Sequence, residues 1–280
     1  MALKNILVQF EANHAGRRRL DVACMLARQN EAHLTGIFVI DPLAMGSQLY
    51  ADDLGMMRLT EQFVNEARIA AREAEDAYRA MTAEAGITAH WENLEGSTGE
   101  LLTARARCMD LTILGQTDPD DRVPTAHGIT LEQVLFGSGR PVLMVPYVGE
   151  FPTIGHNVLI GWTPRRESAR AAHDALSVIV PGAAVCVATI VDNPHDIERR
   201  GHLTDEIKTH FTRHGMKATG QAFVSGGIEP ADALLNVAAD TNADLLVIGA
   251  YGHSRLREFV VGGVTRSLLR QATLPVLMSH

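Results

Sequence analysis

Four glycines near the end of the chain could allow a close approach between the backbone and a ligand. They lie in a run that begins at Gly249 and Gly252 and ends at Gly262 and Gly263, directly after a short apolar segment. Glycine lets the backbone approach a ligand closely, and the free N–H groups that open a following helix attract an anion. In parallel α/β sheets, ligands bind beyond the carboxyl ends of strands. The run therefore predicts a site for an anionic ligand.

Polar side chains inside this run can add to such a site. His253 and Ser254 follow the second glycine, where they can contact phosphate or form a solvated loop, and the sequence leaves both interpretations open. One helix dipole supplies only about 0.3 to 2 kcal/mol, whereas micromolar binding requires about 8 kcal/mol. Several N–H donors and a pocket for the rest of the ligand must therefore act together.

The elements that would position this run occur twice in the chain. Asp110-Leu-Thr-Ile-Leu-Gly is repeated as Asp244-Leu-Leu-Val-Ile-Gly, and Pro141-Val-Leu-Met as Pro275-Val-Leu-Met, at one common offset. Turn residues between Gly149 and Gly155 follow the last apolar run of the first copy. We therefore expect two similar domains, at 1–150 and 151–280.

Short apolar runs alternate with helical patterns in both halves, which predicts a parallel sheet with helices on both of its faces. Ser97-Thr-Gly-Glu100 has the pattern of a helix capping box. The expected strands are 6–10, 34–40, 88–92, 111–114 and 142–145 in the first half, then 158–162, 184–191, 218–223, 245–248 and 276–278 in the second.

The composition limits the classes of function. The chain has 280 residues, of which 46% are hydrophobic, and a formal net charge of −8, which argues against broad nucleic-acid binding. No apolar run approaches the roughly 20 residues that cross a membrane, and no signal-peptide pattern opens the chain, so we expect a cytoplasmic protein without membrane contact. The three cysteines are far apart without CxxC spacing, which predicts reduced thiols.

The glycine run resembles the G-x2-G-x9-G nucleotide motif of the universal stress protein family, with Gly249, Gly252 and Gly262 on the three glycines. The resemblance covers both halves and is strongest between Asp244 and Met278. It implies two tandem Rossmann-like domains of the adenine nucleotide α-hydrolase type, each with a five-stranded parallel sheet. It also implies a stress-response protein with little or no turnover, which binds ATP or AMP in its C-terminal domain, with Mg²⁺ as a candidate companion ion. Its two domains would pair as a pseudo-dimer, and a homodimer is a further option.

The same resemblance implies which residues hold the nucleotide. Adenine would lie near Thr163 and the backbone of Ile190 and Val191, and Thr265 would contact phosphate. The full set is Thr163, Ile190, Val191, Gly249, Gly252, His253, Ser254, Gly262, Gly263, Val264 and Thr265. No catalytic residue and no metal ligand belongs to this set.

Two positions depart from the family pattern. Gly263 replaces a Ser or Thr that donates to phosphate, and Thr163 replaces an adenine-facing Asp. A hydrogen bond to a charged group contributes about 1.5 to 3 kcal/mol, so its loss weakens a site roughly 10- to 100-fold. The alternative is therefore an interaction or scaffold protein that has lost the ligand. A slow ATPase is a third option, but Glu258 is the only carboxylate in the motif.

Other residues give weaker indications. In the first half, Asp118 stands where the second half has Gly252, and Glu11 ends the first strand, so we expect this half to be a structural partner or to bind something other than a nucleotide. His210 and His214 have the i, i+4 spacing of a zinc pair, yet no Cys or Glu has a recognised spacing to them. Solvated histidines are the favoured interpretation.

Overall fold

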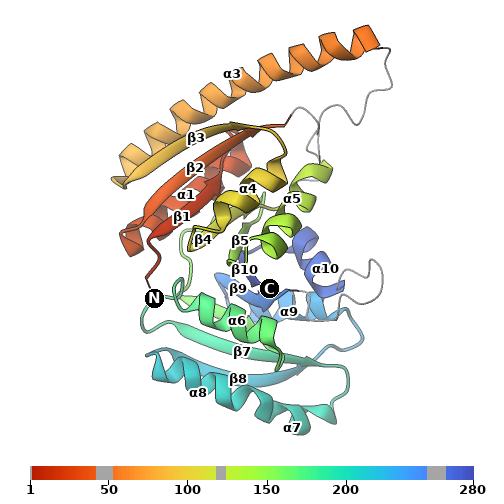
Figure 1. The fold of residues 1–280 in the computed structure, drawn as a ribbon. Helices are drawn as coiled ribbons and strands as arrows, with labels where there is room; N and C mark the ends of the chain where they lie inside the picture. The colour runs from red at the N-terminus through yellow and green to blue at the C-terminus, as the bar shows by residue number, and fades with distance from the viewer. Residues whose placement is uncertain (1, 42–52, 118–123, 251–262) are drawn as a thin grey trace. The chain divides into compact units, whose positions relative to one another are not determined.

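The computed structural model describes residues 2–41, 53–117, 124–250 and 263–280. They form two compact units, Ala2–Val148 and Gly149–His280, called the first half and the second half below. Each half is an α/β domain with one parallel five-stranded sheet and helices on both faces (Figure 1). Strand order in the first sheet is β3-β2-β1-β4-β5, and in the second it is β10-β9-β6-β7-β8.

All ten expected strands are present. In the first half they are β1 (Asn5–Gln9), β2 (His33–Ile40), β3 (Ala89–Glu95), β4 (Leu111–Gly115) and β5 (Val142–Val145). In the second they are β6 (Asn157–Gly161), β7 (Ala184–Val191), β8 (Lys217–Val224), β9 (Leu245–Gly249) and β10 (Val276–Ser279). The central strands are almost wholly apolar because helices cover both of their faces.

Helices connect the successive parallel strands of each half. The first half contains α1 (His14–Asn30), α3 (Asp53–Ala85), α4 (Thr98–Ala106) and α5 (Pro124–Gly137). The second contains α6 (Arg166–Ala175), α7 (Asp196–Gly201), the 3₁₀ turn His202–Thr204, α8 (Asp205–Arg213), α9 (Pro230–Asp240) and α10 (Gly263–Gln271). Helices α1 and α3 pack on each other, and so do α4 and α5.

The repeated aspartates have a structural role. The Asp110 carboxylate accepts hydrogen bonds from the backbone N–H groups of Lys4 and Asn5, at 2.8 and 2.9 Å. In the second half, Asp244 accepts in the same way from Asn157 and the two residues before it. Each carboxylate thus satisfies the donors that precede the first strand of its own half. The repeated Asp at this position is explained by folding alone.

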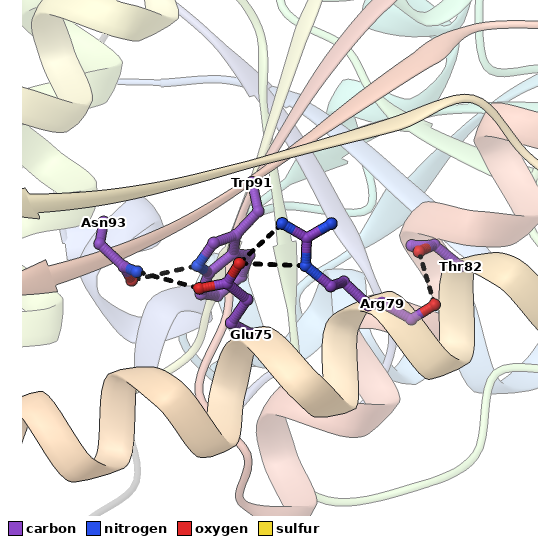
Figure 2. A network of polar contacts seen from close by, with 5 residues as sticks. All are labelled: Glu75, Arg79, Thr82, Trp91 and Asn93. Atoms are coloured by element: carbon purple, nitrogen blue, oxygen red, sulfur yellow. Dashed lines mark hydrogen bonds and ion pairs between the residues drawn. The ribbon is translucent and has the colours of Figure 1, made fainter.

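Aromatic and polar contacts hold α3 on the first sheet. The Tyr78 ring lies 5.0 Å from that of Trp91, and its hydroxyl donates to the Leu34 carbonyl at 2.8 Å. Figure 2 shows the neighbouring polar network, in which Glu75 of α3 accepts from both Arg79 and Asn93. Because Asn93 also accepts from the Trp91 indole at 3.1 Å, the network joins the helix to β3.

The expected capping box at α4 is only half correct. The helix begins at Thr98 after Ser97, as expected, but the Ser97 side chain makes no capping hydrogen bond. Asp41, at the end of β2, accepts instead from the Thr98 backbone N–H at 2.9 Å. A carboxylate near a helix N-terminus also interacts favourably with the dipole, so a distant residue replaces the local cap. Among the described helices, none is long and apolar enough to cross a membrane.

Candidate functional site

A cavity of about 470 Å³ opens at the carboxyl ends of β6, β7 and β9 in the second half. Its walls come from these strand ends and from the first turns of α6, α9 and α10. The described lining residues are Gly161, Trp162, Thr163, Arg165, Glu167, Ser168, Ala188, Ile190, Asp192, Glu229, Pro230, Leu234, Ile248, Gly249, Gly263, Val264 and Thr265. Ligands of parallel α/β sheets bind at this end of the strands.

Gly249 brings the end of β9 against the start of α6. A Cβ atom added to Gly249 would lie 2.3 Å from the Ser168 backbone nitrogen and 2.4 Å from the Glu167 carbonyl carbon. Contacts that short do not occur, so only glycine permits this approach. The glycine that the sequence singled out for ligand contact therefore also has a packing function.

Hydrogen bonds fix the loop between β6 and α6. The Trp162 indole N–H donates to the Leu203 carbonyl at 2.9 Å, and Thr189 donates to the Trp162 carbonyl at 3.1 Å. The Thr163 and Ser168 hydroxyl oxygens lie 3.0 Å apart, so either can be the donor. A hydroxyl pair of this kind can present a donor or an acceptor to a ligand.

Carboxylates make the lining acidic. Glu167, Asp192 and Glu229 face the cavity together with Arg165. Burial alone would raise the pKa of Glu167. The hydrogen bond from Arg166 and the nearby positive charges together outweigh burial, so the pKa of Glu167 is lowered. Glu167 is therefore ionised at neutral pH. A phosphate ligand here would meet negative charge unless a cation accompanied it.

The start of α10 adds partial positive charge to the cavity. Helix α10 begins at Gly263, which lines the cavity, and Thr265 in the same turn is buried. The first N–H groups of a helix have no partner within the helix and carry partial positive charge. A Cβ atom on Gly263 would meet nothing within 4 Å. Among the described residues, none occupies the space where the Ser or Thr side chain of the family pattern would lie at this position.

The residues expected from the sequence fall into three groups. Lining residues of the cavity are Thr163, Ile190, Gly249, Gly263, Val264 and Thr265. Val191 is buried at the end of β7 and does not line it. Gly252, His253, Ser254 and Gly262 lie outside the described residues.

Several lining residues had no signal in the sequence. No motif contains Trp162 or Asp192, which follow β6 and β7, or Glu229, which precedes α9. The rule that loops after parallel strands build the site could have drawn attention to Trp162 and Asp192. Glu229 precedes α9, and only the folded sheet brings it to the same cavity.

The corresponding place in the first half is occupied differently. The Arg19 guanidinium lies over the end of β4, where a Cβ atom on Gly115 would be 2.8 Å from its Nη1. Arg19 is buried and pairs with Glu11, the second residue after β1, at 3.9 Å. Gln116 is buried beside them, and Asp118 lies outside the described residues. The Arg19 side chain thus lies against the end of β4 in the described part of the first half.

Comparisons with known proteins agree with this architecture. The universal stress protein family model matches residues 2–146 and again 156–280. A universal stress protein of Synechocystis is 27% identical over 173 residues, which are 60% of this chain and 57% of that relative, so the match spans little more than half of that protein. One of Mycobacterium tuberculosis is 34% identical over 122 residues, 42% of this chain and 72% of the relative.

A solved structure gives the same result for the fold. The crystal structure of a universal stress protein from Archaeoglobus fulgidus has a TM-score of 0.74 to this chain, with 16% sequence identity. The match covers 98% of this chain and 96% of that one. Because the family model accounts for both halves, the chain belongs to the universal stress protein family, as a tandem member with two Usp domains.

Proposed function

We propose that the second half binds an adenine nucleotide, ATP or AMP, in the cavity beyond β6 and β9, and that the protein acts in a cytoplasmic stress response with little or no turnover. The observation that carries the proposal is that Gly249, Thr163 and the start of α10 line one cavity. Its volume of about 470 Å³ lies within the range of small-molecule sites, roughly 300 to 1,000 Å³.

The two kinds of lining suit the two parts of a nucleotide. Ala188, Ile190, Leu234 and Ile248 offer apolar surface for a base, and the hydroxyl of Thr163 can hydrogen-bond its edge. The N–H groups that open α10 suit phosphate. Glu167, Asp192 and Glu229 would favour a nucleotide that arrives with Mg²⁺, since the cation offsets the carboxylate charge.

The same carboxylates are the observation that favours the second candidate, a scaffold protein without nucleotide. Three acidic side chains and one Arg line the cavity in its described part. Without a cation, their repulsion opposes binding of a polyphosphate. The two functions differ in one measurable quantity, which is the affinity for Mg·ATP.

Substitutions at Gly263 provide a matched test. Both Gly263→Ser and Gly263→Asp place a small side chain in space that holds no described atom within 4 Å, so both variants should fold. An Asp in the first turn stabilises a helix by about 0.3 to 1 kcal/mol, but its charge opposes phosphate. We expect Ser to tighten Mg·ATP binding roughly 10-fold through one hydrogen bond to a charged group. Asp should weaken it by a similar factor.

Calorimetry of the nucleotide-stripped protein, with AMP and GTP as comparisons, measures these affinities. Thermal unfolding without nucleotide controls for folding of both variants. Equal affinities in the wild type and both variants would remove the site from this cavity. No heat at millimolar ATP in any of the three proteins would favour the scaffold. Phosphate release above that of the Gly263→Asp variant would identify a slow ATPase.

A further inference from the structure

Asp192 directly follows β7 and lines the cavity of the second half. Its counterpart in the first half is Asp41, which directly follows β2. Each of these strands pairs with the first strand of its own half, β7 with β6 and β2 with β1. The two aspartates therefore occupy equivalent places, at the carboxyl ends of equivalent strands.

In the first half this carboxylate has a structural role. Asp41 accepts a hydrogen bond from the backbone N–H of Thr98 at 2.9 Å and another from its hydroxyl at 3.1 Å. Because Thr98 is the first residue of α4, the two bonds join the end of β2 to the start of that helix. They satisfy a donor that the helix itself leaves unpaired.

The second half cannot form the equivalent backbone bond. Helix α9, which like α4 follows the third strand of its half, begins at Pro230, and proline has no backbone N–H. Among the hydrogen bonds and ion pairs of the described residues, none involves the Asp192 side chain. Asn193 holds the turn after β7 instead, since its side chain accepts from the His195 backbone N–H at 3.1 Å. The carboxylate of Asp192 is thus exposed and not used by the fold.

Asp192 lies on the side of the cavity away from the proposed phosphate position. The phosphates are proposed to lie at the start of α10, and Gly249 lines the cavity at the end of β9. Strand β6 separates β9 from β7. Neighbouring strands are about 4.8 Å apart, so the ends of β7 and β9 are roughly 10 Å apart. A nucleotide with its phosphate at α10 would therefore extend its nucleoside part toward β7 and Asp192.

The chemistry of a carboxylate suits the nucleoside part. A carboxylate ion accepts hydrogen bonds and donates none, and it repels phosphate. An adenine nucleoside carries donors in its two ribose hydroxyls and in the exocyclic amine of its base. We propose that Asp192 accepts a hydrogen bond from one of these donors and so makes the cavity selective for a nucleoside over phosphate alone. This inference rests on the proposed function and names a residue that decides its specificity.

The test is calorimetric titration of the nucleotide-stripped full chain with three ligands, which are adenosine, AMP in the presence of a chelator, and Mg·ATP. Asp192→Ala should weaken binding of all three by a similar factor of at least about 10, or 1.4 kcal/mol, because all three share the nucleoside. Asp192→Asn keeps an acceptor oxygen and should retain part of the affinity that Asp192→Ala loses.

Nucleoside analogues identify the donor. They are 2′-deoxyadenosine, 3′-deoxyadenosine and inosine, each of which lacks one of the three donor groups. The analogue without the relevant donor should bind the wild type about 10-fold more weakly than adenosine does, or 1.4 kcal/mol. It should bind Asp192→Ala with the same affinity as adenosine, because the acceptor is then absent. Equal affinities of adenosine and all three analogues for the wild type would overturn the inference.

Two controls separate binding from charge and folding. Asp240→Ala removes an exposed carboxylate of the same half that does not line the described cavity, so it should leave every affinity unchanged. Asp41→Ala should lower the thermal unfolding temperature, because α4 loses its cap, whereas Asp192→Ala should not. An equal decrease in both variants would show that Asp192 has a structural role and would overturn the inference.

The signs of the binding changes give the decisive outcomes. Weaker binding of Mg·ATP by Asp192→Ala, together with unchanged or tighter binding of AMP in chelator, would place Asp192 at the cation or the phosphate and overturn the inference. Equal affinities of the wild type and Asp192→Ala for all three ligands would also overturn it, while the proposed function would stand. If the wild type binds none of the ligands at millimolar concentration, the proposed function fails and the inference fails with it.

Discussion

At the scale of single residues, glycine decides how closely backbone segments approach the cavity. Gly249 and Gly263 both line the cavity, but their surroundings differ. Gly249 touches the backbone of Glu167 and Ser168, whereas Gly263 faces open space. A side chain is therefore excluded at the first position and tolerated at the second.

The contact at Gly249 predicts a folding defect. Because its Cβ atom would meet backbone atoms that cannot rotate away, we expect Gly249→Ala to lower the free energy of unfolding by about 1 to 3 kcal/mol. Gly201→Ala is the control, since Gly201 has a helical φ of −57° and nothing within 4 Å of the added carbon. Urea denaturation measures both. Equal stability of the two variants would contradict the close approach of β9 and α6.

At the scale of elements, α1 packs one buried face against α3 and the strands of the first half. Cys24 lies on this face, and burial, followed by the charge of Asp21, raises the pKa of its thiol to about 12. A thiol in the unfolded chain ionises near its ordinary value of 9.0. The unfolded state thus loses its proton first as the pH rises, which lowers stability.

This difference predicts an alkaline loss of stability that depends on Cys24. Its contribution is fully present below pH 9.0 and is lost as the pH rises toward about 12. We expect the urea midpoint of the wild type to fall more steeply between these pH values than that of Cys24→Ala. Measuring both proteins at several pH values separates the slope from the constant cost of the missing sulfur. Parallel curves would show that the thiol does not contribute.

At the scale of the whole molecule, two similar folds have different strand ends. In the second half they border a cavity, whereas in the first half the Arg19 guanidinium lies against Gly115 and pairs with Glu11. The two halves share their strand order but differ in the residues at the strand ends.

The asymmetry predicts one nucleotide per chain. Calorimetry with Mg·ATP should give a stoichiometry near one, and Gly263→Asp should remove most of the binding heat, because in the described part of the first half the Arg19–Glu11 ion pair lies at the strand ends. Equilibrium dialysis with labelled ATP provides an independent count. A stoichiometry of two, with one site left in Gly263→Asp, would show that the first half also binds nucleotide.

Local sequence patterns determined the architecture. The ten apolar runs became the ten strands, and the repeat of Asp110 and Asp244 marked the two copies. These features are readable because buried parallel strands need continuous apolar residues and because helices have a fixed period. The glycine spacing likewise indicated the end of β9 and the start of α10.

Only the tertiary structure decided which distant residues meet. Asp192 and Glu229 line one cavity with Thr163, Arg19 lies against Gly115, and the ring of His173 on α6 packs on that of His210 on α8. No local pattern encodes these meetings, because each one depends on how separate helices and strands pack. The sheets and the glycine run can therefore be predicted from the sequence, whereas the charge of the cavity lining and the contact between His173 and His210 arise from side chains that folding brings together.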